Sequence, residues 1–149
     1  MSLELTINNE IKAAMLAKER VRLESLRAIK AAIILAKTAE GATGEELADA
    51  EVLKIIQKLV KQRRESADIY TQQNRPELAQ TELAEVEAME VFLPKQLSEA
   101  ELEVELKKII ESVGASSPAD MGKVMGAATK ALAGKADGKA ISAMVKNML

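Results

Sequence analysis

The residues best suited to chemistry are glycines and lysines near the C-terminus. Gly122 and Gly126 are four residues apart, so on a helix they lie on one face and leave its backbone bare. Lys123 and Lys130 flank that face. Bare backbone beside ammonium groups suits close approach by a sugar–phosphate chain. The same glycines would also suit tight packing between helices, and the residue types alone leave both interpretations open.

A second basic segment follows at residues 134–139, with the sequence Gly-Lys-Ala-Asp-Gly-Lys. Lys135 and Lys139 lie beside the expected start of a helix at Gly138, where unpaired N–H groups and the helix dipole favour phosphate. Alternatively, Asp137 only caps this helix and the lysines form a solvated face. The segment is not a nucleotide-binding P-loop, because its Gly-Lys pairs lack the upstream glycine and the following hydroxyl residue.

These two segments together predict a nucleic-acid-binding surface. It comprises three glycines and five lysines: Gly122, Lys123, Gly126, Lys130, Lys135, Gly138, Lys139 and Lys146. Residues 121 to 149 contain five lysines and one Asp, which gives this segment a net charge of +4, although the net charge of the whole chain is −2. Segregation of charge along the sequence permits a basic surface on a protein whose net charge is negative.

Another basic run holds five cationic residues and no acidic one: Lys54, Lys58, Lys61, Arg63 and Arg64. Its three lysines follow helical spacing and predict one exposed stripe. The stripe is a second candidate for tracking phosphates. We favour the alternative that it pairs with the acidic segment at residues 77–90, which holds five glutamates, and that the two arginines bridge helices.

Several kinds of catalytic chemistry are excluded by residue type. The chain contains no Cys and no His, which removes thiol nucleophiles, imidazole bases and Cys/His zinc sites. Glu85, Glu87 and Glu90 are close in sequence, but we interpret them as an exposed helix face. We therefore predict no catalytic residue, no metal and no cofactor. With Tyr70 and Phe92 as its two aromatic residues, the chain is poorly equipped to stack bases, so any RNA recognition should be by shape and backbone.

The elements that must position these residues are predicted to be helices. Ala, Leu, Ile, Lys, Glu, Gln and Met dominate, and apolar residues recur with helical spacing. We expect seven helices, near residues 3–18, 20–37, 50–73, 76–91, 99–113, 118–133 and 138–149. No segment alternates with period two, so no sheet is expected.

Local signals mark several of the expected helix ends. Asp49 is a candidate N-cap, Pro76 suits a first turn, and residues 98–101 (Ser-Glu-Ala-Glu) form a candidate capping box. Gly114 should stop the fifth helix, and Ser117 should cap the sixth.

The chain is predicted to form an all-α fold of two helical bundles. Pro94 cannot continue a helix, so we place the boundary there. Residues 1–94 form the four-helix unit and residues 95–149 the three-helix unit. The longest uncharged run is too short to span a bilayer, and the N-terminus lacks the apolar stretch of a signal peptide. We expect a cytoplasmic protein with no membrane partner, and favour a monomer.

Four segments, in this order along the chain, resemble the signatures of the YqeY family. They are residues 61–66 (KQRRES), 92–99 (FLPKQLSE), 121–126 (MGKVMG) and 134–139 (GKADGK). The resemblance covers essentially the whole chain. Lys135 stands where the family more often has Arg, which keeps the charge and loses the bidentate fork.

The resemblance implies a four-helix unit followed by a three-helix unit, and a link to tRNA. The family shares its domain with the C-terminal tail of the B subunit of the glutamyl/aspartyl-tRNA amidotransferase, a mobile appendage that contacts tRNA. The resemblance therefore implies a non-catalytic module whose partner is tRNA or a tRNA-handling enzyme. Two alternatives stay open: a protein–protein adaptor, and a glutamine-dependent carbon–nitrogen ligase by kinship. The ligase would need a nucleophile–base pair that the residues do not supply.

Overall fold

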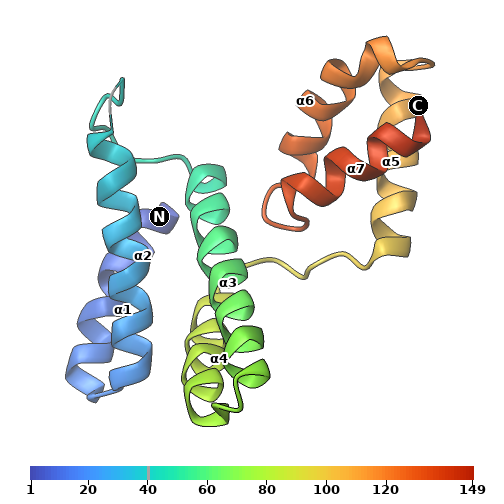
Figure 1. Ribbon diagram of the computed structural model, residues 1–149. Helices are drawn as coiled ribbons and strands as arrows, with labels where there is room; N and C mark the ends of the chain where they lie inside the picture. The colour runs from blue at the N-terminus through green and yellow to red at the C-terminus, as the bar shows by residue number, and fades with distance from the viewer. Residues whose placement is uncertain (40) are drawn as a thin grey trace. The chain divides into compact units, whose positions relative to one another are not determined.

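The structure, a computed structural model, describes residues 1–39 and 41–149. Within these residues the chain forms seven α-helices, one short 3-10 helix (η1, Pro118–Asp120) and no strand (Figure 1). The α-helices are α1 (Leu3–Ala17), α2 (Arg20–Thr38), α3 (Asp49–Gln72), α4 (Pro76–Glu90), α5 (Glu99–Val113), α6 (Met121–Ala131) and α7 (Gly138–Met148). The predicted all-α fold is confirmed. No helix in the described residues is both long and apolar enough to cross a membrane.

The chain divides into two compact units, Met1–Leu93 and Pro94–Leu149, each with its own core. The N-terminal unit contains α1 to α4, and the C-terminal unit contains η1 and α5 to α7. The division falls one residue before the boundary predicted from Pro94. Phe92 packs against the core of the N-terminal unit, as expected for an apolar residue at the end of a bundle.

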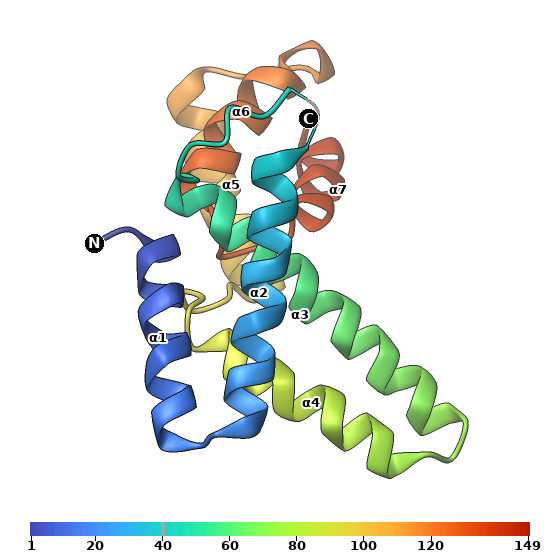
Figure 2. The same cartoon turned by 90° about the vertical axis from the view of Figure 1, so that its left-hand side faces the viewer.

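In the N-terminal unit, helices pack as neighbouring pairs, α1 with α2 and α3 with α4 (Figure 2). Two arginines of α3 reach carboxylates of α4. Arg63 Nε lies 2.8 Å from Glu85 Oε2, and Arg64 pairs with Glu90. The prediction that these arginines bridge helices is therefore confirmed. The lysine stripe is exposed, but Lys54 pairs at 3.6 Å with Glu51 of its own helix and not with α4.

Asp49 was predicted to cap α3, and this prediction is wrong. Ala48 occupies the N-cap position and Asp49 is the first residue of the helix. The Asp49 carboxylate accepts a hydrogen bond of 2.8 Å from the backbone N–H of Leu3. Leu3 begins α1, whose first N–H groups have no partner inside the helix. Asp49 therefore caps a helix distant in sequence, which no local pattern could indicate.

Glu4 is a buried carboxylate that ties α1 to the end of α2 and to the segment before α3. It is 9% exposed, and its Oε1 lies 2.7 Å from Lys37 Nζ. Its Oε2 accepts a hydrogen bond of 2.9 Å from the Leu47 N–H. The Lys37 ammonium, more than the Leu47 N–H, holds the pKa of the Glu4 carboxyl below its ordinary value of 4.5, against the opposing effect of burial. Glu4 should therefore stabilise the folded N-terminal unit in a pH-dependent way.

We expect Glu4→Gln to lower the free energy of unfolding by about 1–2 kcal/mol near pH 7, because the amide loses the charged partner Lys37. Glu4 has a folded pKa below its unfolded pKa, so its contribution is complete above about pH 4.5 and is lost as the pH falls through the folded pKa. Urea unfolding followed by circular dichroism at pH 7 and pH 3 measures both free energies. A wild-type advantage of equal size at the two pH values would contradict this assignment.

In the C-terminal unit, two predicted helix signals are confirmed and one is wrong. Ser98 and Glu101 form the capping box of α5, and Gly114 ends it in the left-handed conformation (φ 67°). The Ser117 side chain makes no cap hydrogen bond. Instead, residues 118–120 form the 3-10 helix η1, and the Asp120 carboxylate accepts a hydrogen bond of 3.0 Å from the Ser116 N–H. The Asp120 side chain makes no cap hydrogen bond to α6 either, so its carboxylate fixes the segment before the turn and does not cap the helix.

Candidate nucleic-acid interface

The outward face of α6 carries four of the eight predicted surface residues. Val124 and Ala128 are 0% exposed and point into the core of the C-terminal unit. At 100° per residue, four exposed residues fall within roughly 100° of arc on the opposite side. They are Gly122, Lys123, Gly126 and Lys130. The structure thus brings these four residues together on one solvent-exposed face, which we call the α6 face.

Neither glycine of the α6 face is needed for packing within the described structure. A Cβ atom built at Gly122 or at Gly126 would meet no atom within 4 Å. Both positions are helical, so no unusual backbone angle demands glycine either. Each glycine costs α6 about 1 kcal/mol relative to alanine. Tight packing between helices of this unit is therefore not the reason for the glycines, and their bare backbone remains open to solvent.

The other four predicted residues lie on α7 and on the loop before it. Lys139 and Lys146 are exposed and seven residues apart on α7, so they lie on the same side of that helix. Gly138 is the exposed first residue of α7, and Lys135 is exposed in the loop. Asp137 occupies the predicted N-cap position of α7.

The loop carrying Lys135 is held by the segment that precedes α5. The Leu97 N–H donates 2.9 Å to the Lys135 carbonyl oxygen. Gln96 Nε2 donates to the carbonyl oxygens of Gly134, at 2.5 Å, and of Pro94, at 2.9 Å. The motifs at residues 92–99 and 134–139 are therefore hydrogen-bonded to each other. This connection fixes the backbone from which the Lys135 side chain projects.

Five of the eight lysines in the C-terminal unit, all between residues 121 and 149, keep their charge available to a partner. Within the fully described range 94–149, no carboxylate lies within 4.0 Å of any of their ammonium groups. They are Lys123, Lys130, Lys135, Lys139 and Lys146. By contrast, Arg63 and Arg64 of the N-terminal unit are already paired.

The pKa of the Asp120 carboxyl is held below its ordinary value mainly by the Ser116 N–H, with a smaller contribution from the Lys123 charge.

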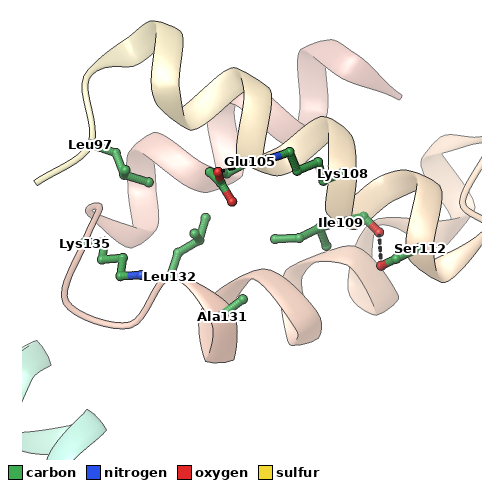
Figure 3. A pocket seen from close by; sticks show the side chains of 8 residues that line it. All are labelled: Leu97, Glu105, Lys108, Ile109, Ser112, Ala131, Leu132 and Lys135. Atoms are coloured by element: carbon green, nitrogen blue, oxygen red, sulfur yellow. Dashed lines mark hydrogen bonds and ion pairs between the residues drawn. The ribbon is translucent and has the colours of Figure 1, made fainter.

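Beside Lys135 the C-terminal unit contains a hollow of about 350 Å³. Its lining comes from the segment before α5, from α5, from the end of α6 and from the loop: Leu97, Glu105, Lys108, Ile109, Ser112, Ala131, Leu132 and Lys135 (Figure 3). Sequence reasoning included only Lys135 of this set. The sequence held one signal for the other polar lining residues: Glu105, Lys108 and Ser112 are spaced so that they lie along one side of a helix.

The described residues offer no acidic cluster for metal binding. Among them, no group of three or more His, Cys, Asp or Glu side chains is arranged to hold a metal ion. Of the three glutamates interpreted as an exposed helix face, Glu85 and Glu90 are half-buried and each is paired with an arginine of α3. Their carboxylates therefore bridge helices in this structure.

Two curated fungal relatives share the name altered inheritance of mitochondria protein 41, mitochondrial. The protein of Meyerozyma guilliermondii is 32% identical, and the match covers 73% of this chain and 65% of the relative. The protein of Lachancea thermotolerans is 27% identical, with 75% and 60% covered. The chain thus spans less than two thirds of either relative. Their names place those proteins in mitochondria, and the cytoplasmic location stays a prediction for this chain.

The family comparison covers almost the entire sequence. Residues 4–149 match the family described as Yqey-like protein, and the match includes both helical units and all eight predicted surface residues. The four motifs that suggested the resemblance lie within the same range. The chain belongs to the family of YqeY-like proteins.

Proposed function

We propose that this protein is a non-catalytic module whose C-terminal unit docks on the sugar–phosphate backbone of tRNA, free or held by a tRNA-handling enzyme. The observation that carries the proposal is the α6 face. A Cβ atom at Gly122 or Gly126 would meet no atom within 4 Å outside the backbone of its own helix. Lys123 and Lys130 are exposed on the same face and have no carboxylate within 4.0 Å in their own unit. A helix that gives up stability in this way gains a surface on which another backbone can lie closely.

The chemistry of the surface favours phosphate over bases. Lysine is a point charge with three donors, which suits phosphate contacts that position a nucleic acid without reading its sequence. The C-terminal unit contains no aromatic residue, so it has no platform for stacking a base. Recognition would therefore follow the shape and charge of folded RNA. The resemblance to the tail of the amidotransferase B subunit supports tRNA as the RNA concerned.

The wild-type protein is expected to bind fluorescently labelled bulk tRNA at about 50 mM salt, measured by fluorescence anisotropy. An equal mass of duplex DNA should compete poorly, because its groove geometry differs from that of an A-form helix. Equal competition by DNA would reduce the proposal to general polyanion binding. Absence of binding at this low salt concentration would refute it and favour the protein–protein adaptor.

A further inference from the structure

The hollow beside Lys135 is a site of defined size and mixed chemistry. At about 350 Å³ it lies near the lower end of the volumes of small-molecule sites, roughly 300–1,000 Å³. Figure 3 shows Glu105 and Lys108 of α5 on one side and Ala131, Leu132 and Lys135 on the other. The space fits a single small group and not an extended chain.

One part of the lining is apolar. Leu97, Ile109, Ala131 and Leu132 contribute aliphatic surface, and Leu132 is only 3% exposed. The hydrogen bond from the Leu97 N–H to the Lys135 carbonyl oxygen holds Leu97 against the loop that follows Leu132. An apolar wall that is fixed in place favours a flat, weakly hydrated group such as a nucleobase.

The polar part of the lining offers both positive charge and hydrogen-bond acceptors. The Lys135 ammonium has no carboxylate within 4.0 Å in its unit, so it is available for an anion. Lys108 lies 3.6 Å from Glu105, a distance that leaves its other protons available. The Ser112 hydroxyl donates 2.9 Å to the Ile109 carbonyl oxygen, so its own oxygen can only accept from a ligand.

These groups together specify a ligand with three features. It carries an anion for Lys135, a flat ring with weakly hydrated faces for the wall, and hydroxyl or amino donors for Glu105 and Ser112. Inorganic phosphate lacks the ring, and a fatty acid lacks the donors. A nucleotide has all three, in its phosphate, its base and its ribose hydroxyls.

Resting on the proposed function, we propose that the hollow binds one unpaired nucleotide of the docked RNA. Lys135 and Lys108 contact its phosphate, Glu105 and Ser112 accept hydrogen bonds from its ribose or base, and the base lies on the aliphatic wall. The lysine surface contacts only the RNA backbone. The hollow would add a preference for RNA that has an accessible unpaired nucleotide.

The first test uses nucleoside 5′-monophosphates with the full-length protein. Titration to about 10 mM, a concentration suited to weak ligands, should shift amide NMR signals of Ile109, Leu132 and Lys135. Ala131→Phe should fill the hollow and abolish these shifts, whereas Ala143→Phe, at an exposed position of α7, should leave them unchanged. Shifts that inorganic phosphate reproduces in full, or that survive Ala131→Phe, would overturn the proposal.

The second test distinguishes a nucleotide within RNA from a free one. The wild type should bind a hairpin with a single-nucleotide bulge about threefold to tenfold more tightly than the fully paired hairpin. Ala131→Phe should remove this preference and leave affinity for the paired hairpin intact. Tight binding of both hairpins with no preference would overturn this proposal alone. Failure to bind either hairpin and tRNA would overturn the proposed function as well.

Discussion

Replacing the five lysines between residues 121 and 149 with glutamine is expected to lower the affinity for tRNA by about two orders of magnitude at about 50 mM salt. The variant carries Lys123→Gln, Lys130→Gln, Lys135→Gln, Lys139→Gln and Lys146→Gln. These side chains are exposed and have no carboxylate within 4.0 Å in their unit, so removing their charge should cost the folded unit little stability. The loss should be similar for different tRNAs, because phosphate contacts carry no sequence information.

A matched control removes the same charge from the N-terminal unit. It replaces five exposed lysines with glutamine: Lys12, Lys18, Lys30, Lys54 and Lys58. Both variants have the same net charge, and circular dichroism should give both the helical content of the wild type. We expect the control to bind tRNA within a few-fold of the wild type. Equal losses in the two variants would mean that net charge, and not the C-terminal surface, determines binding.

Replacing both glycines of the α6 face with alanine should change stability and binding in opposite directions. Gly122→Ala and Gly126→Ala place methyl groups in open space, so the double variant should be more stable by about 1–2 kcal/mol. The same methyl groups hold an approaching sugar–phosphate chain away from the helix, and we expect tRNA affinity to fall about tenfold. Thermal unfolding and anisotropy of the same samples measure the two effects.

A stabilised control separates the two consequences of this change. Val104 lies on α5 and is 53% exposed, and Val104→Ala should raise helix stability by a few tenths of a kcal/mol through higher helix propensity. Its affinity for tRNA should match the wild type. If the double glycine variant is also stabilised and binds tRNA undiminished, the bare backbone of α6 is not part of the interface.

The helices and several of their ends could be predicted because their signals are local. Pro76 begins α4, Ser98 and Glu101 form the capping box of α5, and Gly114 ends α5. Each depends on residues within one turn. The shared orientation of Lys123 and Lys130 was also predictable, because seven residues make nearly two helical turns.

The features that sequence reasoning missed depend on contacts between distant residues. Asp49 caps α1, 46 positions away, and Gln96 holds the carbonyl of Gly134, 38 positions away. The hollow also depends on contacts between distant residues, because its lining comes from the segment before α5, from α5 and from the end of α6. Whether Gly122 faces a neighbouring helix or solvent could also not be decided from spacing, because both arrangements place it on one helical face.

The most direct test of an RNA-docking surface is the salt dependence of wild-type binding to tRNA. Contacts from all five lysines predict a slope of log K against log salt between about −3.5 and −4.5. Affinity should then fall a few hundred-fold between about 50 and about 200 mM salt. Binding that is as tight at the higher salt concentration would contradict phosphate docking and indicate a packed, salt-tolerant interface instead.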